Sequence, residues 1–122
     1  MIIHACVGTA DLERGAKFYD ALATELGAQR TGQTDTAVYW GNPAGGVGIA
    51  ITYPYDGKPA TRGNGTMITF GAKDRDHVDR LHAVALANGG TDEGPPGVRP
   101  NGHYVAYFRD PDGNKLNVVA LS

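Results

Sequence analysis

The chain has 122 residues, of which 41% are hydrophobic and 20% charged, which is ordinary for one globular domain. Its net charge of −2 provides no basic field for nucleic acid or anionic lipid, and Cys6, the single cysteine, excludes an intramolecular disulfide. The first residues lack the basic and apolar regions of a secretory signal, and no apolar run reaches the roughly 20 residues of a membrane span. We therefore expect a cytoplasmic protein with neither nucleic-acid nor membrane partners.

The first half of the chain predicts a strand, a helix and three further strands. Residues 2–8 alternate so that Ile3 shares one strand face with Ala5 and Val7, whereas His4 and Cys6 lie on the other face. The apolar positions of 12–26 recur at helical spacing. This helix is expected to begin after an Asp11 cap and to end at Gly27. The three short strands are expected at 28–31, 36–40 and 47–52.

The same order begins again after a linker. Residues 54–64 contain Pro, Gly and Lys and are typical of a connecting segment. A strand at 66–72 then leads to Asp74, a second candidate N-cap, and to a helix over 76–88. A loop rich in Gly and Pro is expected at 94–102. The last two strands are expected at 104–109 and 115–121.

An internal repeat relates the two halves. A shift of 63 residues places 7–11 on 70–74 and Gly27 on Gly90. Near the ends of the halves the shift becomes 68, which places 39–43 on 107–111. The sequence thus predicts one α+β domain over 1–122. It comprises βαβββ module one at 1–53, the linker 54–64 and module two at 65–122. Each module has one helix to cover one face of its sheet, so the two remaining faces are expected to enclose a shared pocket.

Three motifs resemble a known family. They are His4-x-x-Val7-x-x-x-Asp11-Leu12, the pair Phe18-Tyr19, and the turn Asp110-Pro111-Asp112-Gly113-Asn114. Together they resemble the vicinal oxygen chelate superfamily, which includes glyoxalase I, extradiol dioxygenases, methylmalonyl-CoA epimerase and the bleomycin-resistance proteins. The resemblance implies a glyoxalase-like fold with U-shaped mixed sheets, and it implies a homodimer because members commonly pair.

In metal-dependent members of that family, the first and last strands of each module supply the metal ligands. Carried over by position, these ligands fall on His4, Ile49, Met67 and Asn117, where the family pattern has His or Gln, Glu, His and Glu. Ile49 cannot ligate, and the thioether of Met67 suits Mn, Mg, Fe(II) or Zn poorly. Asn117 offers a neutral carbonyl oxygen in place of a carboxylate. We therefore expect no metal cofactor. The alternative is a divalent metal on unusual ligands, including a weak pair formed by His4 and Cys6.

Further residues are candidates for binding a small molecule. Thr69 shares the strand face of the first-strand candidate Met67. Tyr53 and Tyr55, near prolines in the connecting segment, are expected to line a pocket mouth and grip a planar ligand. Arg62 and Arg99 lie in the two long loops, where each either meets a carboxylate or phosphate or is simply solvated. We expect Trp40 and Phe108 to lie in the core.

These observations support two main hypotheses of function. The first is a small-molecule-binding protein of the glyoxalase/bleomycin-resistance kind with a degenerate metal site. The alternative is a glyoxalase-like lyase, isomerase or dioxygenase that uses His4 with non-standard ligands or as a general base. A regulatory module with an empty pocket is a third reading. Whether the protein is an enzyme stays open on the sequence.

Overall fold

The computed structural model describes residues 1–121, which form two βαβββ modules. The first module contains β1 (His4–Gly8), α1 (Leu12–Leu26), β2 (Gln29–Gln33), β3 (Ala37–Gly41) and β4 (Gly48–Thr52). The second contains β5 (Ile68–Ala72), α2 (Arg75–Ala87), β6 (Thr91–Val98), β7 (Tyr104–Arg109) and β8 (Lys115–Ala120). The predicted α+β fold of two such modules is confirmed.

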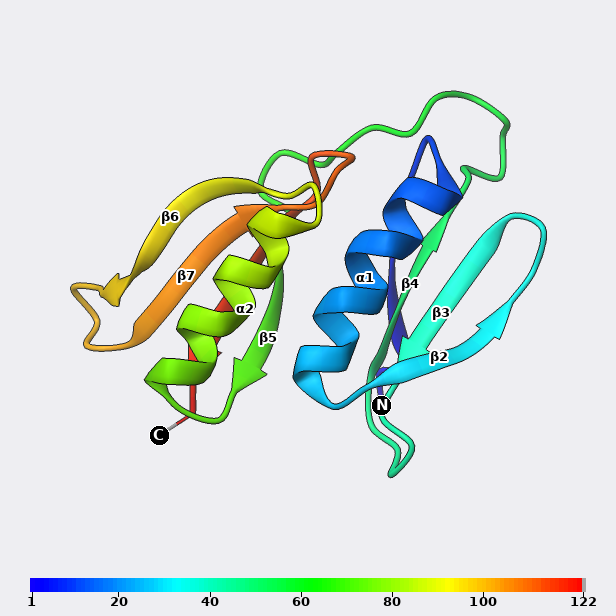
Figure 1. The fold of residues 1–122 in the computed structure, drawn as a ribbon. Coiled ribbons are helices and arrows are strands. Elements are labelled where there is room, and N and C mark those ends of the chain that lie inside the picture. The colour runs from blue at the N-terminus through cyan, green and yellow to red at the C-terminus, as the bar shows by residue number, and fades with distance from the viewer. Residues whose placement is uncertain (122) are drawn as a thin grey trace.

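The two mixed sheets have the same topology. Their strand orders are β1-β4-β3-β2, here called sheet A, and β5-β8-β7-β6, here called sheet B. In each sheet the first strand of the module forms an edge and runs parallel to the last strand. Figure 1 shows α1 and α2 side by side in front of the two sheets. The opposite face of each sheet is therefore not covered by its helix, and we call it the helix-free face.

Both helices begin at the predicted caps. The Asp11 side chain accepts a hydrogen bond from the backbone N–H of Arg14 at 3.1 Å, and Asp74 accepts one from His77 at 2.8 Å. Helix α1 ends at Gly27, whose φ of 77° lies in the left-handed region that glycine adopts without strain. The amphipathic pattern therefore predicted the bounds of α1 correctly. Neither α1 nor α2, the helices of residues 1–121, is long and apolar enough to cross a bilayer.

The predicted loop at 94–102 is wrong in its first half, because β6 runs from Thr91 to Val98. This strand contains Pro95 and Pro96, which cannot donate backbone hydrogen bonds. It lies at the edge of sheet B, where an unpaired side tolerates proline, and its register with β7 shifts on both sides of Gly94. The proline content therefore predicted a loop where the structure has an edge strand.

The repeat also needs a correction. Trp40 pairs with Ile49 across β3 and β4, and Phe108 pairs with Leu116 across β7 and β8. The connection from β3 to β4 is therefore one residue longer than the connection from β7 to β8. The shift of 68 that relates β3 to β7 consequently falls to 67 at the last strands. The repeat partner of Asn117 is Ala50, not Ile49.

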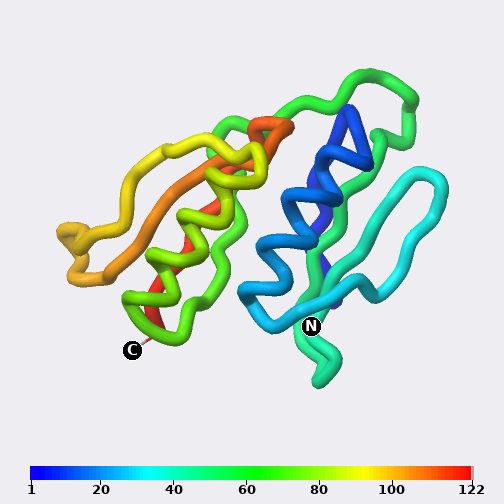
Figure 2. Tube along the Cα trace, in the orientation of Figure 1, coloured from blue at the N-terminus to red at the C-terminus, as the bar shows by residue number. Residues whose placement is uncertain are grey.

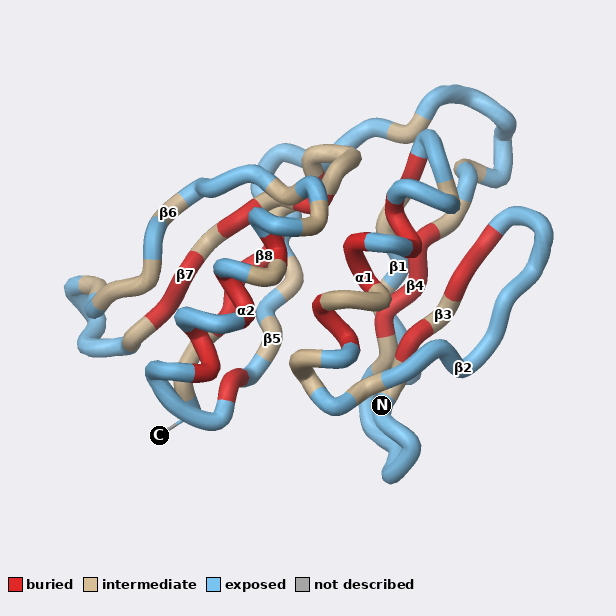
Figure 3. Tube along the Cα trace, in the orientation of Figure 1, coloured by how far each residue is buried: buried red, intermediate tan, exposed pale blue. Residues whose placement is uncertain are grey.

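One hydrophobic core unites the modules. Buried residues follow the helices and the central strands of both sheets (Figure 3). Trp40 and Phe108 belong to this core, as predicted. Ile3 does not belong to the core, because it precedes β1 and is 80% exposed, so the predicted strand at 2–8 begins two residues later than expected. The tube in Figure 2 shows the connecting segment between β4 and β5 crossing from one module to the other above this core.

Candidate functional site

Strand register decides which side chains share a face, because residues paired across neighbouring strands point to the same side. In sheet A, Cys6 pairs with Ala50, which pairs with Tyr39, and His4 lies two residues before Cys6. These four residues therefore lie on the helix-free face. Ile49 alternates with Ala50 and points into the core beneath α1.

The helix-free face of sheet A carries His4 at its exposed end. The His4 ring meets the Tyr39 ring edge to face, with centroids 5.4 Å apart. Both side chains line a cleft of about 400 Å³, together with Thr31 and Asn42. Partial burial raises the pKa of the Cys6 thiol, which disfavours the thiolate form in the free protein.

The helix-free face of sheet B contains three more of the predicted residues. Met67 is 42% exposed, Thr69 is exposed, and Asn117 is 3% exposed. The Thr69 hydroxyl donates a hydrogen bond of 2.6 Å to Oδ1 of Asn117. The carbonyl oxygen that a metal would need is therefore already engaged by a neighbouring side chain.

The donor set at the family's four ligand positions does not fit a catalytic divalent metal. With the corrected repeat, these positions hold His4, Ala50, Met67 and Asn117. They supply one imidazole and no carboxylate, whereas a catalytic site needs about three protein ligands. Residues 1–121 contain no group of three or more His, Cys, Asp or Glu side chains placed to hold a metal ion.

The two loop tyrosines differ in their surroundings. The Tyr53 hydroxyl accepts a hydrogen bond of 3.3 Å from the backbone N–H of Leu12, so this residue helps to cap the start of α1. Tyr55 is fully exposed. Within the described chain, neither tyrosine lines any of the clefts that hold His4 or Met67.

The loop arginines lie on the sheet B side of the molecule. Arg62 lines a cleft of about 460 Å³ with Met67, Arg109 and Lys115. Arg99 lies over the Tyr107 ring at 5.5 Å. Sequence reasoning missed Arg109 and Lys115, although their alternation with Asn117 and Tyr107 along the last two strands already places them on this face.

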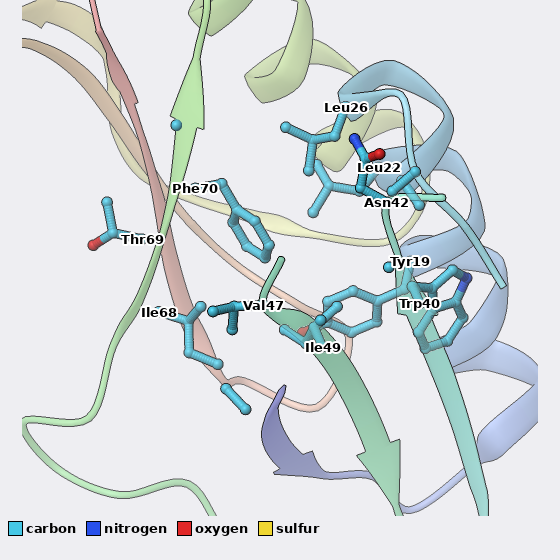
Figure 4. Close-up of a pocket in the computed structure, with 16 residues that line it drawn as sticks. Tyr19, Leu22, Leu26, Trp40, Asn42, Val47, Ile49, Ile68, Thr69 and Phe70 are labelled. Atoms are coloured by element: carbon cyan, nitrogen blue, oxygen red, sulfur yellow. The ribbon is translucent and has the colours of Figure 1, made fainter. Parts of the chain in front are cut away.

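A separate apolar cavity of about 300 Å³ lies between the modules on the helix side. Figure 4 shows Phe70 and Ile68 reaching toward Leu22 and Ile49 across this cavity, whereas Thr69 points away on the other side of β5. Among the predicted site residues, Ile49 and Thr69 both belong to the lining of this cavity, although the Thr69 side chain points to the other face of β5. His4 and Met67 line two different clefts, each built from one module or its adjoining linker, so one chain does not bring them together.

Comparison with known proteins places this geometry in a family. A family model described as the Glyoxalase/Bleomycin resistance protein/Dioxygenase superfamily matches residues 1–118. The chain belongs to this superfamily, as the motifs predicted. No curated protein sequence matches the chain.

Solved structures agree with that assignment. A glyoxalase/bleomycin resistance protein from Albidiferax ferrireducens T118 is 42% identical, with a TM-score of 0.91, over 100% of this chain and 99% of that one. The lactoylglutathione lyase from Agrobacterium tumefaciens is 22% identical, with a TM-score of 0.71, over 99% of this chain and 93% of that one. A glyoxalase-related enzyme from Fulvimarina pelagi is 20% identical, with a TM-score of 0.80, over 98% of this chain and 87% of that one. The latter two likenesses show the fold alone.

Proposed function

We propose that this protein binds a small organic molecule on the helix-free faces of its sheets without a catalytic metal. The observation that carries the proposal is the set of side chains at the family's ligand positions. Ala50 has no donor atom, Met67 offers a thioether, and Oδ1 of Asn117 accepts the Thr69 hydroxyl. Side chains of this kind suit the binding of an organic ligand better than the chemistry of a catalytic metal.

We further propose that the complete pocket forms across a homodimer. The clefts at His4 and at Met67 are separate in one chain. A second copy that sets its sheet B against sheet A of the first would bring the two clefts together, and the symmetry would produce two such pockets. Exposed apolar side chains support this pairing, since they are costly in an isolated chain. They include Ile2, Ile3, Val47, Met67 and Val98.

Binding of small aromatic compounds to chelator-treated protein tests the main proposal. Backbone amide resonances should shift in β1, β4, β5 and β8, whose side chains form the helix-free faces. Replacement of Tyr39 by alanine should weaken binding on the sheet A side, whereas replacement of the fully exposed Tyr55 should not. Shifts confined to the cavity around Phe70 and Leu22 would contradict the proposed site.

A second candidate function is catalysis by His4. The imidazole is exposed on the helix-free face beside Tyr39, where it could accept a proton from a bound substrate. Turnover of the methylglyoxal–glutathione hemithioacetal tests this activity. Turnover that disappears in His4→Ala and persists in His103→Ala, a matched change in an exposed loop, would favour the enzyme over simple binding.

A further inference from the structure

The cleft beside Met67 gathers three cationic side chains from two distant parts of the chain. Arg62 comes from the segment between the modules, and Arg109 and Lys115 come from β7 and β8. In Figure 1 this segment passes next to the turn between β7 and β8. The cleft measures about 460 Å³, which is sufficient for part of a small organic ligand.

The backbone explains why these cations converge. Arg109 and Lys115 pair directly across β7 and β8, so both side chains lie on the helix-free face of sheet B. The turn between them contains Gly113, whose φ is +87°. The Arg62 guanidinium packs against Gly113 in the space that a Cβ atom would otherwise fill. A glycine at this turn therefore lets the loop arginine approach the strand cations.

The positive charge of the cleft is only partly neutralised. Arg109 forms an ion pair with Glu93 and donates from Nη1 to the Gly113 carbonyl at 2.8 Å. The pKa of Glu93 lies below its usual range, first because of the hydrogen bond from Arg109, and Lys115 contributes to the lowering. Glu93 thus neutralises part of the charge of Arg109 and Lys115. Within residues 1–121, Arg62 takes part in no ion pair. This is a local basic site on a chain whose net charge is −2.

An aromatic ring adjoins the cations on the same face. Tyr107 pairs with Asn117, and its ring lies 5.4 Å from Nζ of Lys115 and 5.5 Å from the Arg99 guanidinium. Both cations lie over this ring, so an aromatic side chain adjoins the positive charge of the cleft. This arrangement suits a ligand that combines a planar group with an anionic group.

We propose that Arg62, Arg109 and Lys115 form a subsite for an anionic oxygen group, a carboxylate or a phosphoryl group, of a ligand that also contacts Tyr107. The inference rests on the proposed function, since it assigns a ligand class to the helix-free face of sheet B. Guanidinium groups bind such anions through paired hydrogen bonds, and the lysine adds a point charge.

The test measures binding of phenyl phosphate, benzoate and the neutral compound benzyl alcohol by amide shifts in the full chain. Arg62→Gln removes one cation without removing any ion pair of the fold. It should weaken binding of the preferred anion about fivefold, the factor for one close charge pair in water. Glu93→Gln removes the carboxylate that pairs with Arg109 and should strengthen binding of that anion. Lys58→Gln is the matched control, because it removes a cation from the same segment but outside the cleft.

The possible outcomes distinguish failure of the anion subsite from failure of the proposed ligand binding. Shifts at residues 62–67 and 109–115 with phenyl phosphate or benzoate, weakened by Arg62→Gln and by added salt, support the subsite, and the tighter anion identifies the group bound. Benzyl alcohol binding on the sheet faces as tightly as both anions, with Arg62→Gln and Glu93→Gln without effect, would overturn the subsite and leave the proposed function intact. If none of the three compounds shifts any amide of the sheet faces, the proposed function fails together with the subsite.

Discussion

Asp110 is a buried carboxylate held by neutral groups. It is 3% exposed. Its Oδ2 accepts hydrogen bonds from the Tyr19 hydroxyl and from Nδ2 of Asn114, and its Oδ1 accepts from the backbone N–H groups of Asp112 and Asn114. Burial raises the pKa of Asp110, and these hydrogen bonds oppose the rise. Burial also raises the pKa of Tyr19 well above its ordinary value, so this hydroxyl remains a donor at neutral pH.

The raised pKa of Asp110 gives Tyr19→Phe a pH-dependent cost. A carboxyl whose folded pKa exceeds its unfolded pKa destabilises the fold when it ionises, so its penalty is absent at pH below the unfolded pKa and complete above the folded pKa. Loss of the Tyr19 hydroxyl removes a hydrogen bond that lowers the Asp110 pKa, and therefore enlarges this penalty. We expect Tyr19→Phe to reduce the free energy of unfolding by about 1–3 kcal/mol at pH 7. The reduction should be smaller at pH below the ordinary pKa of aspartate.

Denaturant unfolding at both pH values checks this expectation. Tyr55→Phe is the control, because Tyr55 is fully exposed and should show no difference from the original protein at either pH. An equal cost of Tyr19→Phe at the two pH values would show that the hydroxyl does not stabilise an ionised Asp110.

At the level of elements, hydrogen bonds join the turn between β7 and β8 to the turn between β1 and α1. Oδ1 of Asp112 accepts from the backbone N–H of Ala10 and from the Arg14 guanidinium, and Oδ2 accepts from the buried Thr9 hydroxyl. Nδ2 of Asn114 donates to the Gly8 carbonyl at 2.9 Å. The motif that indicated the family is therefore a junction between the modules.

Asp112→Asn should weaken this junction. The amide keeps one acceptor for Thr9 or Ala10 but loses the charge that pairs with Arg14. We expect the free energy of unfolding to fall by about 1–3 kcal/mol. Thermal or denaturant unfolding measures the change, with Asp35→Asn in the exposed turn between β2 and β3 as the control. A variant as stable as this control would mean that the hydrogen bonds of Asp112 do not stabilise the packing of the two modules.

Local signals predicted the elements better than the contacts between them. The Asp11 cap and the apolar spacing of 12–26 were sufficient for α1. The β6 strand was missed because Pro95 and Pro96 are tolerated only at a sheet edge, and edge position is a property of the assembled sheet. The hydrogen bonds between the two turns could not be derived from the sequence, because Thr9 and Asp112 are 103 residues apart.

Across the whole molecule, the candidate site residues are divided between the two modules. His4 and Asn117 were correctly placed on strand faces without a helix, since alternation along a strand is a local property. Ile49 was misassigned because one additional residue between β3 and β4 moves the repeat by one position, which reverses the face. The sequence predicted Arg62 as a candidate but not the basic cleft, because the path of the connecting segment decides that Arg62 and Arg109 line the same cleft.

The divided site leads to a prediction about assembly. We expect sedimentation equilibrium to give a mass twice the 12.8 kDa of the chain. Ile3→Glu places a charge on an exposed apolar position beside β1, so it should favour the monomer while leaving the fold of the chain unchanged. A protein that is monomeric at all concentrations would contradict a pocket shared between two copies.

On the proposed function, the helix-free faces bind a ligand without a catalytic metal. Elemental analysis of the purified protein, after dialysis against a mild chelator, tests for such a metal. The donor set of His4, Ala50, Met67 and Asn117 predicts no Zn, Ni, Mn or Fe above trace amounts. Near-stoichiometric metal that is lost in His4→Ala would contradict metal-free binding.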